Sequence, residues 1–227
     1  FADTKYGLDP AFRFTVSRAV YKGMLKFLSG RYGVRYCVQP LPVHSFSATL
    51  TGEGKVQLSW RPTLDSLELT AMPDRYMLYT RIDDGAFDNG ELLTGLRHED
   101  GRLTIDRNID QGHIYSYRIV ACNEGGRSFP SETLSVGEVE CSPHTVLVVN
   151  NFDRVAPPAW FDTPTYAGFD ERLDAGVPYM YEINRIGEMY QYRRDLQWLD
   201  DDNPGFGASY TDNAGRLVPG NTFDFTT

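Results

Sequence analysis

The side chains best placed for chemistry follow a short apolar run in the later part of the 227-residue chain. Residues 145–149 read Thr-Val-Leu-Val-Val, which is typical of a strand buried on both faces. The polar residues that come next are Asn150, Asn151, Asp153 and Arg154. Open α/β sheets bind their ligands at the carboxyl ends of such strands, so these residues are candidates for a catalytic site. Residues of these types also cap strands and form turns, and that second interpretation stays open.

Three consecutive carboxylates offer a second kind of site. Asp200, Asp201 and Asp202 could supply the oxygen ligands that Ca²⁺ prefers. The run lacks the alternating spacing and the closing Glu of an EF-hand, so an ordinary acidic turn is the simpler interpretation. The histidines are scattered without a metal-ligand spacing, and they are His44, His98, His113 and His144. We therefore expect structural or solvated histidines and no metal site among them.

Aromatic side chains could form a third kind of site, because their faces stack on the apolar faces of sugar rings. The candidates for carbohydrate binding are Trp160, Trp198 and Tyr210, and each could equally belong to a core. The sequence holds no nucleophile-elbow, Walker or dinucleotide motif.

The charge of the chain is uneven along its length. The formal net charge of −9 divides into +5 for residues 1–42, −7 for residues 43–141 and −7 for residues 142–227. Phosphate binding needs clustered cations, so the two acidic parts argue against nucleic acid as a partner. No apolar run reaches the length of a membrane span. The cysteines lack a metal-binding spacing, and they are Cys37, Cys122 and Cys141.

One helix should precede the elements that carry these side chains. Asp9 before Pro10 is a typical N-cap, and apolar residues recur at helical spacing as far as Leu28. This pattern predicts an amphipathic helix over residues 10–29, with a loop over residues 1–8. A single helix cannot bury its own apolar stripe, so it must pack on another part of this or a longer protein.

A stiff connection and a set of short strands come next. Residues 33–43 contain Pro40 and Pro42, which favour an extended linker. Alternating apolar residues then predict about seven short strands, which suits a β-sandwich. The predicted strands are residues 45–50, 56–60, 76–82, 91–93, 103–105, 115–122 and 133–139. Their alternation places Met77, Tyr79 and Arg81 on one face and Cys122 on the polar side of its strand.

Three of these strands resemble a fibronectin type III domain. The matching runs are Val-Gln-Leu-Ser-Trp ending at Trp60, Tyr-Met-Leu-Tyr ending at Tyr79, and Tyr-Ser-Tyr-Arg-Ile-Val-Ala-Cys-Asn from Tyr115 to Asn123, followed by Gly-Gly and Pro-Ser. The resemblance covers about residues 43–140. It implies that Trp60 is the core aromatic residue, that Tyr115 forms a tyrosine corner and that Asn123 is structural.

The order of the parts resembles multidomain surface proteins of Bacteroides-type bacteria, labelled xanthan lyases or N-acetylmuramoyl-L-alanine amidase-like proteins. The resemblance implies the last helix of an amidase-like domain in residues 1–32, a linker in 33–43, a fibronectin type III domain in 44–141, and the start of an incomplete α/β domain in 142–227. Zinc would belong to the amidase-like domain before Phe1, so no cofactor is expected in this chain.

Three functional hypotheses follow. The first is a non-catalytic fibronectin type III spacer or interaction module of an enzyme that acts on cell-wall or polysaccharide substrates. The second is part of a lyase or hydrolase with its site at residues 150–154, and the third is a carbohydrate-binding module. The expected partners are neighbouring domains of the parent chain and glycans. By resemblance, the location would be secreted, periplasmic or on the surface of a Gram-negative bacterium.

Overall fold

A computed structural model describes residues 2–52, 54–139, 144–149, 154–170, 173–174, 176–178, 191–193 and 222–224. Several candidate residues lie outside the described residues, and they are Cys141, Asn150, Asn151, Asp153, Trp198, Asp200, Asp201, Asp202 and Tyr210. The chain divides into two compact units, Lys22–Val146 and Phe1–Tyr21 with Leu147–Thr227. The domain boundaries expected at residues 32, 43 and 141 stay predictions.

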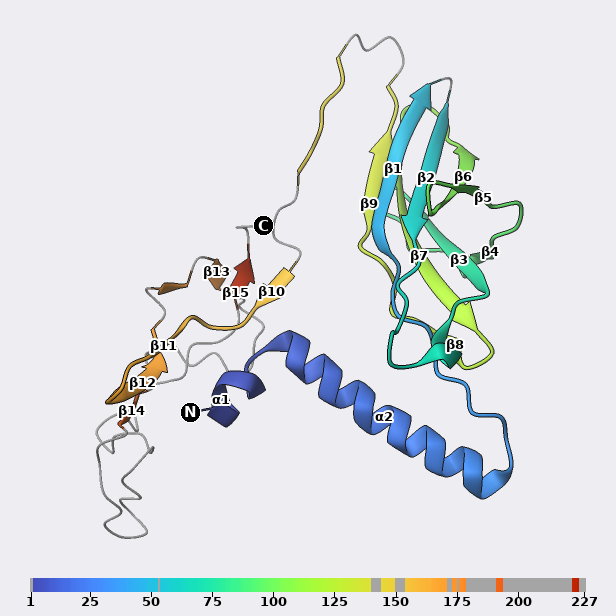
Figure 1. Cartoon of the computed structure of the whole chain (residues 1–227). Coiled ribbons are helices and arrows are strands. Elements are labelled where there is room, and N and C mark those ends of the chain that lie inside the picture. The colour runs from blue at the N-terminus through green and yellow to red at the C-terminus, as the bar shows by residue number, and fades with distance from the viewer. Residues whose placement is uncertain are drawn as a thin grey trace. The chain divides into compact units, whose positions relative to one another are not determined.

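The unit Lys22–Val146 contains two antiparallel sheets that face each other (Figure 1). The first has the order β1-β2-β6-β5, with β1 (His44–Gly52), β2 (Lys55–Arg61), β6 (Arg102–Asn108) and β5 (Arg97–Glu99). The second has the order β4-β3-β7-β8, with β4 (Glu91–Leu92), β3 (Arg75–Ile82), β7 (Ile114–Asn123) and β8 (Gly126–Arg127), and β9 (Leu134–Gly137) also pairs with β7. The mainly β fold class is therefore confirmed, as a fibronectin type III-like sandwich.

The inward positions of both sheets form one apolar core. Trp60 on β2, Leu78 on β3 and Ile119 on β7 are at most 1% exposed. The Trp60 ring meets the ring of Tyr76 edge to face, with centroids 5.4 Å apart, an arrangement that aromatic pairs favour. Burying each large side chain of this kind contributes about 1.5–3 kcal/mol, so the facing strands hold the sandwich together.

Strand β7 is buried on both faces, which the sequence did not predict. Cys122 lies on the polar-side register that its alternation predicts, paired with Arg75 and Arg127, but it is only 4% exposed. The reason is that β7 lies at the centre of its sheet, between β3 on one side and β8 and β9 on the other. On the outer face, Arg118 of β7 lies against the rings of Phe87 and of Tyr79 on β3.

The last strand of the sandwich is split into β8 and β9 around Pro130. Proline has no N–H for a sheet ladder. Between the two pieces, the hydroxyl of Ser128 accepts a 3.0 Å hydrogen bond from Ala121 N, and the hydroxyl of Ser131 accepts one of 2.9 Å from Ile119 N. These two serines keep the edge of β7 hydrogen-bonded where the strand partner is interrupted.

Two helices precede the sandwich in the sequence. α1 (Ala2–Gly7) replaces the loop expected over residues 1–8, because a short helical segment without a period or a cap gives no signal in the sequence. α2 (Pro10–Tyr32) confirms the predicted helix and extends it by three residues. Asp9 caps it, with Ala11 N donating 2.8 Å to Asp9 Oδ1.

The apolar stripe of α2 is exposed. Phe12 and Val16 are 44% exposed, Val20 is 52% exposed and Phe27 is 71% exposed. Phe14 and Met24 are exposed as well, so apolar side chains lie around much of the helix, and the prediction of one narrow amphipathic stripe is wrong.

The described C-terminal residues form two small antiparallel sheets. One joins β10 (Arg154–Ala156), β15 (Thr222–Asp224) and β13 (Val177–Pro178), and the other joins β11 (Trp160–Asp162), β12 (Tyr166–Phe169) and β14 (Gln191–Arg193). Earlier in the sequence, a short 3₁₀ turn, η1 (Leu69–Ala71), lies in the connection between β2 and β3.

One expectation for the C-terminal part of the chain is wrong. Residues 145–149 form no strand, and Val146 and Leu147 are 82% and 84% exposed. An apolar run predicts burial only where another element covers it, and here none of the described residues does so. Residues 191–193 form the strand β14, which pairs with β12.

Candidate functional site

The sequence-predicted candidates that the structure describes do not gather into one site. Arg154 is the first residue of β10. The Trp160 ring, on β11, lies under the Lys5 ammonium, with Lys5 Nζ 3.1 Å from the ring centroid. A cation over one ring face leaves only the other face for a sugar. The structure therefore gives no specific support to stacking of a sugar on Trp160.

Asn123, at the end of β7, is the centre of a joint between the sandwich and the segment that precedes it. Its side-chain Nδ2 donates to three backbone carbonyl oxygens, those of Val38 at 2.8 Å, Thr70 at 3.0 Å and Met72 at 3.3 Å. Its Oδ1 accepts a 2.8 Å bond from Gly125 N. One buried amide thus joins three separate stretches of chain, which explains in physical terms why this position is structural.

The predicted linker is docked on the sandwich. Val38 is fully buried and Pro40 has less than 2% of its surface exposed. The backbone of Cys37 and Val38 lies directly against Gly125, where an added Cβ would overlap the Cys37 carbonyl group. The two prolines favour an extended segment, and its part around Val38 and Pro40 is buried against the sandwich.

Glu68 extends the joint to the helix. Its carboxylate accepts hydrogen bonds from Thr70 Oγ1 at 2.7 Å and Tyr36 Oη at 2.8 Å, and lies 3.5 Å from Lys22 Nζ on α2. Burial by itself would raise the pKa of this carboxyl. The hydrogen bonds from Thr70 and Tyr36 and the Lys22 charge outweigh that effect, so the pKa of Glu68 is lowered. The charged form is thus the one that the joint stabilises.

A second feature is the outer face of the β4-β3-β7-β8 sheet, which carries four arginines. On β3 and β7 the outward positions pair Arg75 with Cys122, Tyr79 with Arg118 and Arg81 with Ser116, and on β8 Arg127 pairs with Cys122. No Asp or Glu occupies an outward position of β3 or β7. This face is cationic although residues 43–141 carry a net charge of −7.

Aromatic residues contact three of these four guanidinium groups, those of Arg81, Arg118 and Arg127. Arg118 Cζ lies 4.0 Å from the ring centroid of Phe87 and 5.3 Å from that of Tyr79. Arg81 Cζ lies 5.2 Å from the Phe87 centroid, and Arg127 donates 3.1 Å to the Tyr79 hydroxyl. A guanidinium group held against a ring loses little further freedom on binding an anion, so Arg81 and Arg118 are preorganised.

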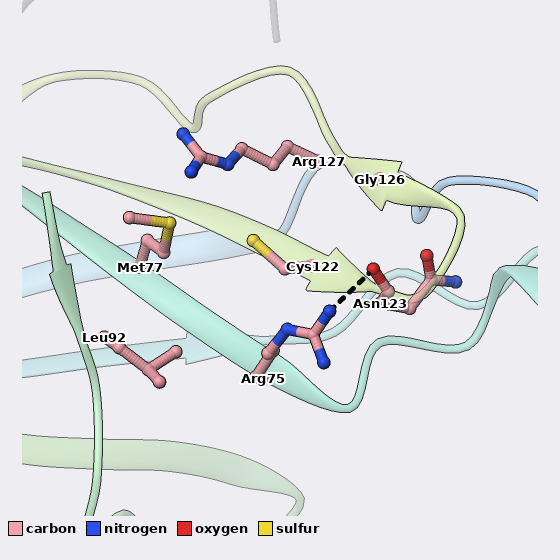
Figure 2. A pocket seen from close by; sticks show the side chains of 7 residues that line it. All are labelled: Arg75, Met77, Leu92, Cys122, Asn123, Gly126 and Arg127. Carbon is pink, nitrogen blue, oxygen red and sulfur yellow. Dashed lines mark hydrogen bonds between the residues drawn. The ribbon is translucent and has the colours of Figure 1, made fainter.

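At one end of this face is a pocket of about 220 Å³, shown in Figure 2. Its lining consists of Arg75, Met77, Leu92, Cys122, Asn123, Gly126 and Arg127. Arg75 is oriented by a 3.0 Å bond to the Asn123 carbonyl oxygen, and Arg75 and Arg127 lie on opposite sides of Cys122. Burial raises the pKa of the Cys122 thiol, against the opposing effect of the two guanidinium groups. The pocket therefore combines two cations with a neutral thiol and two apolar side chains.

Part of this face could be predicted from the sequence. Met77, Tyr79 and Arg81 alternate on one strand, so the pattern alone puts them together. The pattern does not bring Arg118 and Arg127 beside them, because the register between strands is set by turns and packing that the sequence leaves open.

Other site types find no support in the described residues. They contain no group of three or more His, Cys, Asp or Glu side chains that could hold a metal ion. Among the described helices none is long and apolar enough to span a membrane. The Asn123 joint and the arginine pocket are two features of the described residues that a functional role could use.

Strand order and paired register define the class of protein, a chain built on a fibronectin type III-like β-sandwich. No protein-family model matches the sequence, and no curated protein matches it. Among solved structures, the human fourth fibronectin type III domain has 20% identity and a TM-score of 0.35, over 48% of this chain and 87% of that one. The third fibronectin III domain of human KIAA0343 protein has 11% identity and a TM-score of 0.35, over 48% and 90%.

The twitchin kinase region from C. elegans has 23% identity and a TM-score of 0.34. The match covers 45% of this chain and 17% of the twitchin chain. TM-scores this low carry no argument about activity, and the description of the fold depends on the strands themselves.

Proposed function

We propose that this chain is a non-catalytic spacer and interaction module that fixes the direction between a helix and a β-sandwich in a larger protein. The observation that carries the proposal is the Asn123 joint. Three carbonyl groups converge on one buried amide, and the adjoining Glu68 carboxylate reaches Lys22 on α2. A flexible tether would need neither the buried Val38 nor the close contact at Gly125.

The finer part of the proposal comes from the sequence resemblance alone. By that resemblance, the parent protein is a secreted, periplasmic or surface enzyme of a Gram-negative bacterium that acts on cell-wall or polysaccharide substrates. Its zinc would sit in a preceding amidase-like domain, and its partners would be the neighbouring domains of the same chain. The site hypothesis at Asn150, Asn151, Asp153 and Arg154 stays a prediction for such a parent.

Residual dipolar couplings measured on the full chain test the spacer role. We expect a single alignment tensor to fit the amides of residues 22–32 and those of the sandwich, residues 44–137, because the joint holds them as one body. The variant Asn123→Ala should require two tensors. Two independent tensors in the unmodified chain would overturn the spacer role.

A separate experiment tests the proposal that the chain is not catalytic. The purified chain should release no reducing ends or unsaturated sugars from xanthan and no amino groups from peptidoglycan. Turnover above a heat-treated control, lost on substitution of a named residue, would contradict it.

A further inference from the structure

We infer that the pocket between Arg75 and Arg127 binds the carboxylate of an acidic sugar residue within a polysaccharide. The first ground is charge. The outward positions of β3, β7 and β8 carry four guanidinium groups and no carboxylate, within a stretch of sequence that is otherwise acidic. This face is cationic although residues 43–141 as a whole are negatively charged. A local cationic face of this kind favours an anionic ligand.

The second ground is the spacing of the two cations. Arg75 and Arg127 both pair with Cys122 from opposite sides, so their strands lie two inter-strand spacings apart, about 10 Å. Two long side chains rooted at that separation can direct their N–H groups at one oxyanion between them. Guanidinium groups bind carboxylates through paired, charge-assisted hydrogen bonds.

The third ground is that neither cation is held in a buried ion pair. Arg127 is exposed, and its bond to Tyr79 goes to a neutral hydroxyl. Arg75 lies 3.3 Å from Asp74, but both side chains are about half exposed, which makes the pair weak. The Cys122 thiol stays neutral near neutral pH because burial raises its pKa, so it adds no competing negative charge.

Size and apolar lining point to a sugar ring as the body that carries the carboxylate. At about 220 Å³ the pocket is smaller than the ~300–1,000 Å³ typical of whole drug-sized ligands, so it takes one residue of a longer chain. Met77 and Leu92 line it beside the two guanidinium groups. A uronic acid carries its carboxylate directly on a ring with apolar C–H faces, which matches cations and apolar groups side by side. An aspartate or glutamate of a peptide carries its carboxylate on a flexible stem with no such face.

The test is an NMR titration of the full chain at low ionic strength with three probes. The probes are a galacturonate trimer, the uncharged galactose trimer and a glutamate tripeptide. We expect the galacturonate trimer to shift the amide signals of Cys122 and Gly126, at least about ten times more tightly than either other probe. Binding should weaken as salt screens the charges.

Variants then locate the site. Arg127→Gln, at an exposed position, should weaken galacturonate binding at least tenfold, and Arg75→Gln should do the same. Arg97→Gln is the matched control, because Arg97 pairs with Asp106 on the other sheet, and it should leave binding unchanged.

Three results would overturn the inference: no shift with galacturonate, equal binding of the galactose trimer, or unchanged binding by Arg127→Gln. Tighter binding of the glutamate tripeptide would replace the acidic sugar with an acidic peptide. Arg127→Gln should keep the single alignment tensor, so failure of this inference and failure of the spacer role are separate outcomes.

Discussion

The side-chain amide of Asn123 donates a 2.8 Å hydrogen bond to the carbonyl oxygen of Val38, 85 positions earlier in the sequence. This bond closes the carboxyl-terminal end of β7 against a segment that the prolines alone would leave as a linker. Val38 is fully buried, so its carbonyl oxygen has no access to water as an alternative partner. The joint therefore depends on one amide that no backbone group can replace.

Asn123→Ala should lower the free energy of unfolding by about 2–4 kcal/mol, because it leaves the carbonyl groups of Val38 and Thr70 without their donor. Urea denaturation followed by Trp fluorescence measures the change. Asn89→Ala, at an exposed position, is the control and should change it by less than about 0.5 kcal/mol. Equal effects of the two variants would show that the convergent bonds contribute no stability.

Gly125→Ala tests the close approach at the same joint. An added Cβ would overlap the Cys37 carbonyl, so the segment must shift, at a cost of about 1–3 kcal/mol. Gly23→Ala on α2 is the control, since nothing lies within 4 Å of its added Cβ, and it should stabilise the helix by up to about 1 kcal/mol. The urea unfolding midpoints of both variants measure these changes in stability. A Gly125→Ala protein that is more stable than the unmodified chain would contradict the close contact between Gly125 and Cys37.

Alternation along single strands was enough to predict most of the sandwich. Residues 56–60 and 76–82 alternate so regularly that the strands Lys55–Arg61 and Arg75–Ile82 differ from them by one residue at most at each end. The strands β5 and β8 were missed because two or three residues have no measurable period. The exposed run at residues 145–149 was misread because apolar composition does not say what will cover it.

The joint and the pocket depend on contacts between distant residues, which alternation cannot supply. Asn123 was recognised as structural by resemblance, but its three carbonyl partners lie about 50 to 85 positions away. Arg127 reaches Tyr79 only because β8 folds back beside β7. The turn geometry and the strand register determine both the Asn123 contacts and the Arg127 contact with Tyr79. Neither can be predicted from the local sequence.

The joint should weaken in acid through Glu68. Its folded-state pKa lies below the ordinary value of 4.5, so its contribution to stability is fully present above pH 4.5 and is lost as pH falls through the folded pKa. Glu68→Gln should therefore be less stable than the unmodified chain at pH 7, with the difference shrinking toward pH 3. Urea midpoints across this range check it, with Glu132→Gln at an exposed position as the control. If the difference in stability between Glu68→Gln and the unmodified chain stays constant down to pH 3, the charge of Glu68 does not contribute to stability.

The thiol of Cys122 should be unreactive at neutral pH, which keeps the arginine pocket cationic. It is 4% exposed and burial raises its pKa, so both access and thiolate content are low. In the variant Cys37→Ser with Cys141→Ser, iodoacetamide should label Cys122 at least about 100-fold more slowly than in the same chain unfolded in urea, because labelling requires local opening.

Mass spectrometry of timed samples gives both rates, and a chain that retains only Cys37, which is partly exposed, provides the comparison. Below the pKa, the rate should rise about tenfold per pH unit, since only the thiolate reacts. Equal rates in the folded and unfolded chains would mean that the thiol is open to solvent, and the pocket would then hold a reactive group between its two cations.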